Sequence, residues 1–243
     1  MDRWLDRKNH PATRTELHYG DRIIRCFVER PKSVDEMLAN AVARRSDGLA
    51  LICGEERLRY SELVALVGEA AGGLRAFGVG KGDRVAMVLG NSIEFVVVLF
   101  ALARLGAVSV PLNIRHKLAE NSHIIRDCEA KVVVHEFDLA DRVPAPGAAP
   151  SLKHAVAIRR QGESMLAELR SGPQVQEAEA VGEEETATIL YTSGTTGRPK
   201  GAMLTHLSIA HSVIHYRVTM GLTEDDRALI EIGRASCRER VWR

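Results

Sequence analysis

The sequence has few aromatic residues and no excess of either charge. Phe, Trp and Tyr make up 5% of its 243 residues, too few for the row of rings on which single-stranded nucleic acid stacks. Lys and Arg number 33 and Asp and Glu number 32, so the formal net charge is +1. Such a charge gives no long-range field for nucleic acid or an anionic membrane. We therefore expect no nucleic-acid partner.

Paired cysteines and long apolar segments are also missing from the sequence. Its four cysteines, Cys26, Cys53, Cys128 and Cys237, show no Cys-x-x-Cys spacing, and a chain of this length needs no disulfide framework. The longest uninterrupted apolar run is Phe95–Ala103, about half of the ~20 residues that span a bilayer. The polar N-terminus lacks a signal-peptide pattern. We expect reduced thiols, no membrane span and a cytoplasmic location.

The central part of the chain alternates short apolar runs with helical periodicity. Apolar runs at 85–89, 108–112 and 131–135 predict strands that are covered on both faces. Helical patterns separate them, the first with Asn91 as its N-cap and Glu94 as the capping-box partner. A β-α-β-α-β order implies a parallel sheet. The predicted fold class is α/β, a parallel-sheet subdomain with flanking helices.

The rest of the chain is divided by composition. Helices are expected after Ser33, at 61–77 and at 163–169, with strands at 50–53, 56–60 and 154–158. Residues 174–185 are rich in glutamate and contain no Lys or Arg, as in a solvated linker. The expected parts are an irregular lead-in at 1–30, an α/β subdomain at 31–173, an acidic linker at 174–185, and a phosphate-binding loop with its following helix at 186–230.

The segment 192–201, Thr-Ser-Gly-Thr-Thr-Gly-Arg-Pro-Lys-Gly, carries the clearest chemistry. It places four hydroxyls, three glycines and two cations in ten residues after a β-type run. Glycines let backbone N–H groups approach phosphate oxygens, hydroxyls donate hydrogen bonds, and a lysine offsets negative charge. The Walker A loop fits poorly, because Pro199 and Gly201 flank Lys200 where that loop has Gly and Ser or Thr. A plain Gly/Ser/Thr-rich turn is the other alternative.

The segment Tyr191 to Gly201, YTSGTTGRPKG, resembles the signature loop of the adenylate-forming (AMP-binding) enzymes, which include the acyl-CoA synthetases. The stretch Arg59 to Asn113 is similar to the N-terminal subdomain of that family, and a weaker similarity extends from about Arg25 to Ile230. The resemblance implies an acid–thiol ligase. A carboxylate would attack the α-phosphate of ATP to give an acyl-adenylate, and coenzyme A would take the acyl group.

The resemblance also implies roles for individual residues. Ser193, Thr195 and Thr196 would donate to phosphate oxygens, while Gly194 and Gly197 would allow close approach. Lys200 would be catalytic by balancing the charge of pyrophosphate, and Thr192 would lie near Mg²⁺. The implied cofactor-binding residues are Thr192, Ser193, Gly194, Thr195, Thr196, Gly197 and Lys200. The implied cofactors are ATP and Mg²⁺, with coenzyme A as a co-substrate.

The family's adenine-binding, acid-binding and ribose-binding segments would all follow this loop, and none occurs here. After Ile230 the sequence departs from the family, and Glu231 to Val241 resembles the in-frame translation of a sequencing adapter. We therefore expect residues 231–243 to be a non-native tail and the chain to be an inactive N-terminal fragment. The identity of the acid, the thiol acceptor and the oligomeric state stay open. A non-catalytic polyphosphate- or nucleotide-binding module is the alternative function.

Two further sequence patterns are better explained by structural roles than by phosphate or metal binding. Gly78, Gly80 and Gly82 precede a strand, whereas dinucleotide loops follow one, so they predict a helix-to-strand turn. His211 and His215 are four residues apart on the helix after the loop, but no Glu lies between them and no third ligand is near in sequence. We expect no metal site at this pair.

Overall fold

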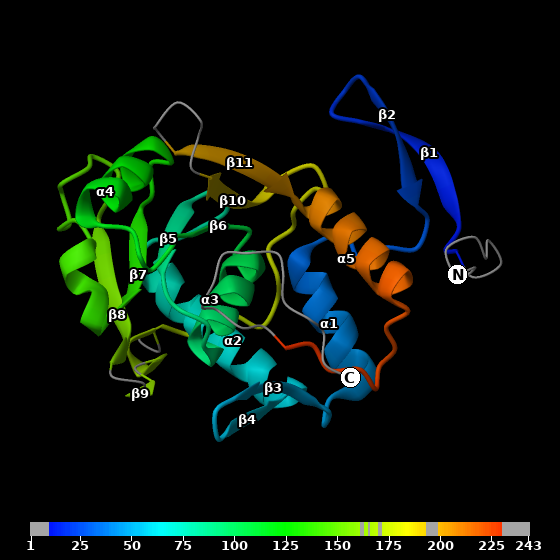
Figure 1. The fold of residues 1–243 in the computed structure, drawn as a ribbon, viewed down its shortest axis with the longest axis horizontal. Helices are drawn as coiled ribbons and strands as arrows, with labels where there is room; N and C mark the ends of the chain where they lie inside the picture. The colour runs from blue at the N-terminus through cyan, green and yellow to red at the C-terminus, as the bar shows by residue number, and fades with distance from the viewer. Residues whose placement is uncertain (1–9, 161–162, 165, 170–171, 193–198, 230–243) are drawn as a thin grey trace. The chain divides into compact units, whose positions relative to one another are not determined.

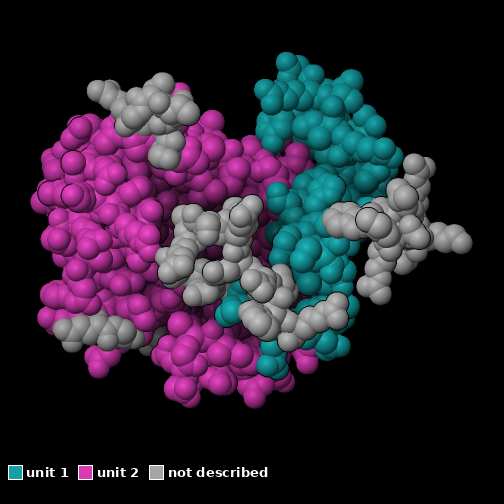
Figure 2. All heavy atoms as spheres, in the orientation of Figure 1, with its two compact units in different colours: residues 1–30, 211–243 teal, residues 31–210 magenta. Residues whose placement is uncertain are grey.

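The computed structural model describes residues 10–160, 163–164, 166–169, 172–192 and 199–229. The chain divides into two compact units, residues 1–30 with 211–243 and residues 31–210 (Figure 2). Among the described residues, no helix is both long enough and apolar enough to cross a bilayer. The elements, in chain order (Figure 1), are β1 Thr13–His18, β2 Arg22–Phe27, α1 Val34–Arg45, β3 Leu49–Cys53, β4 Glu56–Arg59, α2 Tyr60–Ala76, β5 Arg84–Val88, α3 Ile93–Arg104, β6 Val108–Pro111, α4 Leu118–Asp127, β7 Val132–Glu136, β8 His154–Arg160, β9 Glu163–Ser164, β10 Thr186–Thr192, β11 Lys200–Thr205 and α5 His206–Met220.

A seven-stranded sheet forms the centre of the unit 31–210. Its strand order is β11-β10-β6-β5-β7-β8-β9. The five strands β10, β6, β5, β7 and β8 pair in parallel, while β11 and β9 join the two edges antiparallel. The predicted α/β class with a mostly parallel sheet is therefore confirmed.

Both faces of this sheet are covered, as the continuous apolar runs predict. In β5, Val85 and Met87 pack into one core cluster together with α2 and α3. Their neighbours Ala86 and Val88 belong to a second cluster that includes Ile124 of α4. All four β5 residues are fully buried. Because successive side chains of a strand point to opposite faces, each core receives every second residue.

Helix α2 carries glycines where another segment crosses it closely. A Cβ atom on Gly72 would meet the carbonyl oxygen of Pro173, and one on Gly73 would meet the backbone of Leu169. The Val175 N–H also donates to the Gly68 carbonyl oxygen at 3.0 Å. The small residues of α2 thus let the segment before the signature loop lie directly against the helix.

Several local predictions are confirmed at the atomic level. Ser33 caps α1, because its side chain accepts the Glu36 N–H at 3.1 Å. Gly54 has a φ of +60° in the β3–β4 hairpin, where glycine is strain-free. Gly78 and Gly82 both have a φ of +78° between α2 and β5, as a helix-to-strand turn requires. Asp83 closes this turn by accepting the Gly80 N–H at 2.9 Å.

Three predictions differ from the structure. The lead-in at 1–30 contains the β1–β2 hairpin, whose alternation was obscured by charged residues on both strands. Ser92, and not Asn91, caps α3, since its hydroxyl accepts the Phe95 N–H at 3.2 Å. The expected helix at 163–169 comprises, among its described residues, strand β9 and a short 3-10 helix, Leu166–Leu169. Leu166 and Leu169 are buried in the core, so packing decides their conformation.

Candidate functional site

The signature loop leaves the sheet at the end of β10 and returns at the start of β11. The two strands are antiparallel neighbours, and Thr192 lies opposite Lys200 in their register. Both residues are exposed. The predicted phosphate-binding residues Ser193, Gly194, Thr195, Thr196 and Gly197 lie outside the described residues. The structure thus brings the two ends of the candidate site together as a cross-strand pair.

Thr192 and Lys200 project from the same face of the hairpin. Directly opposed residues of an antiparallel pair point to one side, and the next pair along points to the other. The next pair here is Tyr191 with Gly201, which therefore faces away from Thr192 and Lys200. The register therefore places a threonine and a lysine side chain on one face, where the loop begins and ends.

On the opposite face, Tyr191 attaches the base of the loop to α4. A Cβ atom on Gly201 would lie 2.9 Å from the Tyr191 Cζ and 2.8 Å from the Ile189 Cγ2, so only glycine lets the ring cover its partner. The Tyr191 hydroxyl donates to Asp127 Oδ2 of α4 at 2.5 Å. Burial, and then this hydrogen bond, raise the pKa of Tyr191, so the phenol remains a donor at neutral pH.

Asp127 was not predicted as part of this site. Tyr191 and Gly201 are the first and last residues of the signature segment 191–201. Asp127 is 64 residues away from Tyr191 in sequence, at the end of α4. Nothing in the local pattern at Asp127 distinguishes it from any other acidic residue at a helix end. Only the placement of α4 beside β10 reveals the contact.

A partly buried pair of hydroxyls attaches β10 to β6. The Ser109 and Thr188 hydroxyls lie 2.8 Å apart, and Ser109 Oγ also donates to the Ala187 carbonyl oxygen at 3.3 Å. Ser109 of β6 is 1% exposed. Since Thr188 opposite Ser109 is the one register pair between β10 and β6, these hydroxyls replace part of a regular ladder.

The far end of β11 is attached through His206, the first residue of α5. Its Nδ1 accepts the Val34 N–H at 3.1 Å, and its backbone N–H donates to the Glu185 carbonyl oxygen at 3.1 Å. His206 is 2% exposed, and burial lowers its pKa. The Leu207 N–H donates to the Glu183 carbonyl oxygen at 2.7 Å. The end of the acidic segment therefore helps to position the strand that carries Lys200.

The remainder of the acidic segment also packs against other parts of the unit 31–210, to which it belongs. The Glu179 N–H donates to the Arg104 carbonyl oxygen at 2.8 Å, and Lys81 pairs with Glu185 at 2.9 Å. Val175 is 5% exposed and belongs to the larger core cluster. Residues 174–185, expected to form a solvated linker, thus include buried and hydrogen-bonded positions. A single valine between Gln174 and Gln176, at the start of a glutamate-rich segment, gave too weak a signal to predict this.

The order of elements around the loop is strand, loop, strand. A Walker A loop leads from a strand into a helix, whose N-terminus faces the phosphates. Here β11 separates the loop from α5, which begins at His206. The residues that flank Lys200 do not fit a Walker A loop, and the strand–loop–strand order does not fit one either. Positive charge at this loop comes from a side chain at a strand start, without a helix dipole.

The histidine pair on α5 packs around an aromatic ring. The Phe27 ring lies 5.0 Å from His211 and 4.8 Å from His215, measured between centroids. The two imidazole centroids are 6.4 Å apart. Within the described part of the chain, these histidines belong to no group of three metal ligands. The packing contacts account for their shared helix face.

Comparisons with known proteins agree with the fold and with the position of the signature loop. Residues 38–231 match the family described as AMP-binding enzyme. The long-chain-fatty-acid–CoA ligase FadD13 of Mycobacterium tuberculosis is 35% identical over 176 residues, which are 72% of this chain and 35% of that protein. A feruloyl-CoA synthase of an Amycolatopsis species is 37% identical over 194 residues, 80% of this chain and 36% of that protein.

Solved structures show the same fold. A long-chain-fatty-acid–CoA ligase (FadD1) from Archaeoglobus fulgidus matches with a TM-score of 0.71 and 28% identity, over 82% of this chain and 42% of that one. The chain belongs to the AMP-binding enzyme family, and its fold is that of the N-terminal part of these adenylate-forming enzymes. It spans about a third of the length of the curated relatives it matches.

Proposed function

We propose that the protein to which this chain belongs activates a carboxylic acid with ATP and transfers the acyl group to coenzyme A. The acid would displace pyrophosphate from ATP to form an acyl-adenylate, and a thiol would then displace AMP. Membership of the AMP-binding enzyme family and the CoA-ligase names of the relatives support this reaction class. The structural observation that carries it is the pairing of Thr192 with Lys200 at the base of the signature loop.

The loop would bind the β- and γ-phosphates of ATP. Ser193, Thr195 and Thr196 supply hydroxyl donors, and Gly194 and Gly197 let the backbone approach the oxygens. Lys200 enters from the opposite strand end, on the same face as Thr192. The Thr192 hydroxyl would assist in holding Mg²⁺, which supplies charge neutralisation on the phosphates when it is bound.

Lys200 is proposed as the catalytic residue of this segment. Negative charge grows on the leaving pyrophosphate as the bond to the α-phosphate breaks. A fixed ammonium group stabilises that charge more than it stabilises bound ATP, and such differential binding lowers the barrier. Lys200 begins a strand whose other end is attached through His206 and whose partner strand is attached through Tyr191 and Ser109. Because these contacts hold both strands, they limit the positions that the Lys200 ammonium group can reach.

Because the chain spans about a third of its relatives, we propose that these 243 residues alone do not complete the reaction. The carboxylic acid and coenzyme A are the proposed partners of the whole protein. The relatives are named for acids as different as long-chain fatty acids and ferulate. The proposal therefore specifies a carboxylic acid and no narrower class.

The test is ATP–pyrophosphate exchange, with a panel of carboxylic acids, in a protein extended to the length of the relatives. Lys200→Ala should lower the exchange rate by about 10²- to 10³-fold, as loss of one transition-state contact does, with little change in melting temperature. Lys153→Ala, at an exposed lysine after residues 144–150, should leave both quantities unchanged. Near-normal exchange by the Lys200→Ala protein, with a lowered melting temperature, would show that Lys200 is structural.

A non-catalytic polyphosphate-binding module is the second candidate function. It is favoured by the observation that both strands flanking the loop, and the contacts of Tyr191, lie within this chain. The 243-residue chain would then bind pyrophosphate and ATP alike, because only the phosphates are contacted. Calorimetry distinguishes the candidates: equal affinity for both ligands favours the module. The ligase proposal expects ATP binding by this chain weaker than ~1 mM.

A further inference from the structure

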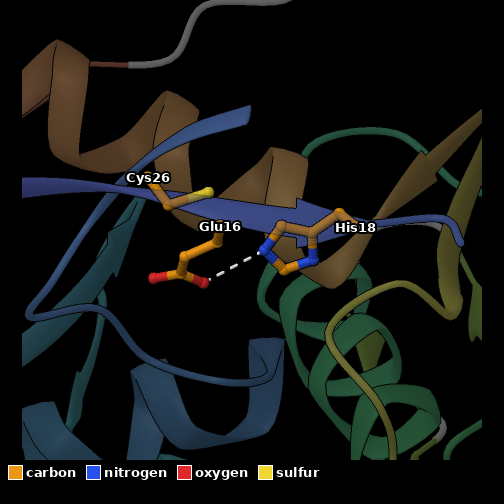
Figure 3. Close-up of side chains that lie close together, drawn as sticks. All are labelled: Glu16, His18 and Cys26. Carbon is orange, nitrogen blue, oxygen red and sulfur yellow. Dashed lines mark hydrogen bonds and ion pairs between the residues drawn. The ribbon is translucent and has the colours of Figure 1, made fainter. Parts of the chain in front are cut away.

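One face of the β1–β2 hairpin gathers three side chains that commonly ligate metals. Glu16 and His18 are two residues apart on β1, so they point to the same side. Cys26 of β2 lies opposite Arg14, which places it on this side too, diagonal to Glu16. Figure 3 shows the His18 ring turned toward the Glu16 carboxylate, with Cys26 beside them. The hairpin register alone brings a carboxylate, an imidazole and a thiol together.

The distances within this group are close to those of a metal site. One donor atom from each residue lies within 4.8 Å of the others. His18 Nε2 and Glu16 Oε2 are 3.1 Å apart. In a tetrahedral zinc site with bonds of 2.0–2.3 Å, neighbouring donors lie about 3.3 to 3.6 Å apart. The imidazole and carboxylate therefore already have about the right spacing, and the thiol, within 4.8 Å of both, would have to move closer to them.

Two members of the group, the imidazole and the thiol, are shielded from water. Cys26 is fully buried and His18 is 7% exposed. A buried thiol is a different case at Cys128, where desolvation raises the pKa to about 11 and no other ligand is grouped with it among the described residues. Among the cysteines that the structure describes, Cys26 alone has two further donors within reach.

We propose that Glu16, His18 and Cys26 bind a thiophilic divalent cation of the Zn²⁺ type, as a structural site joining β1 to β2. A thiolate with an imidazole and a carboxylate is a zinc ligand set, whereas Mg²⁺ and Ca²⁺ prefer oxygen donors alone. The three ligands come from a different part of the sequence than the signature loop, and the proposal does not depend on the function proposed for that loop. A two-stranded hairpin is marginally stable by itself, so a metal cross-link would stabilise these strands directly.

Two guanidinium groups oppose this cation and define how it binds. Arg30 donates from Nη2 to Glu16 Oε2 at 2.6 Å and from Nη1 to Oε1 at 3.0 Å. Arg14 Nε donates to Oε1 at 2.6 Å. The metal would take the place of the His18 contact on Oε2, an oxygen that also accepts from Arg30 Nη2, while Arg30 Nη1 would keep its bond to Oε1. Repulsion from the two arginines makes the affinity weaker than that of a site without neighbouring positive charge.

Cobalt titration of the 243-residue chain tests the site. A thiolate ligand gives Co²⁺ a charge-transfer absorption band, which added Zn²⁺ should remove by displacement. We expect the band to saturate at one equivalent and to disappear in Cys26→Ser. The matched control is Cys53→Ser, because Cys53 is a half-buried cysteine outside the group, and it should keep the band. An absent band in the wild-type chain, or a band that survives Cys26→Ser, would overturn the proposal.

Two further variants keep the test informative if Cys26→Ser does not fold. His18→Gln should weaken Co²⁺ binding at least tenfold, because an imidazole ligand is lost. Arg14→Gln should tighten it severalfold, since the exposed Arg14 repels the cation without ligating it. If Arg14 only stabilised the hairpin, the Arg14→Gln substitution would not increase the affinity for Co²⁺. Unchanged affinity in both variants would place the ion elsewhere and contradict the assignment.

Discussion

At the scale of single residues, the molecule depends on a few buried polar contacts between distant parts of the sequence. Arg104 and Asp35 join α3 to α1 with an Nε–Oδ1 distance of 3.0 Å, and their side chains are 5% and 9% exposed. His206 joins α5 to the start of α1 through Val34. Each contact satisfies a group that would otherwise be buried without a partner.

Removing one member of the buried ion pair should be costly. Asp35→Ala leaves the Arg104 guanidinium buried without its counter-ion, and we expect a loss of about 3 to 5 kcal/mol in the free energy of unfolding. The exposed pair Lys32–Glu183 supplies the comparison, because Lys32→Ala should cost at most about 1 kcal/mol. Urea denaturation of the variants measures both. Equal effects at the two sites would contradict the assigned difference in burial.

His206 should make stability depend on pH in a defined direction. Burial lowers its pKa below the value of about 6.5 expected for the unfolded chain, so the unfolded state takes up the proton first. The contribution of His206 is complete above pH ~6.5 and is lost as the pH falls through the folded-state value. His206→Asn keeps an acceptor for the Val34 N–H but does not titrate.

The measurement is the free energy of unfolding of wild type and His206→Asn between neutral and acidic pH. The difference between the two proteins should be constant above pH ~6.5 and should shift in favour of the variant below it. Burial also lowers the pKa of His135, so the free energy of unfolding of both proteins declines in the same way at acidic pH. This shared decline cancels when the two proteins are compared. A difference that stays constant throughout would exclude His206 as the titrating group.

At the scale of elements, sequence patterns predicted what depends on neighbours in sequence. The strand β5 and the helix α1 were predicted because alternation, apolar runs and the Ser33 cap are local signals. The role of Asp127 and the buried position of Val175 were not, because each depends on a segment that arrives from far along the chain. The cap of α3 moved from Asn91 to Ser92 because both residue types are good caps and only the path of the chain chooses between them.

Helix α2 gives an element-scale prediction in which propensity and packing have opposite signs. By helix propensity alone, Gly72→Ala should stabilise the protein by up to about 1 kcal/mol. The added methyl group would instead meet the Pro173 carbonyl oxygen, and we expect a loss of about 1 to 3 kcal/mol. Thermal or urea unfolding decides the sign.

The control for this prediction is Ala65→Gly on an exposed position of the same helix. Only propensity acts there, so stability should fall by about 1 kcal/mol. If Gly72→Ala stabilised the protein by the amount that Ala65→Gly destabilises it, the close crossing of residues 172–175 over α2 would be incorrect.

At the scale of the whole molecule, the exposed edge of the main sheet is the feature with the clearest consequence. Strand β11 ends the strand order, and Met203 on it is 71% exposed. Leu190 on the neighbouring β10 is 41% exposed. An edge strand with unpaired backbone groups and apolar side chains is a template for association with another chain.

We therefore expect the 243-residue chain to self-associate through this edge, and Met203→Lys to reduce the association. A charge on an edge strand opposes pairing with a second copy. Leu118→Lys adds the same charge at a 45% exposed leucine at the start of α4, and it should have little effect. Analytical ultracentrifugation over a range of concentrations measures the outcome. An equal response to both lysines would indicate a general effect of net charge.

The cover that Tyr191 forms over Gly201 has a consequence for how this loop can change in evolution. Insertions or deletions between residues 193 and 199 alter the reach of the loop but leave the strand register untouched. One residue inserted between Lys200 and Gly201 would instead turn the ammonium group to the opposite face, while the ring still occupied its place over the glycine. The spacing from lysine to glycine should therefore tolerate no length variation, whereas the length of the loop itself can drift.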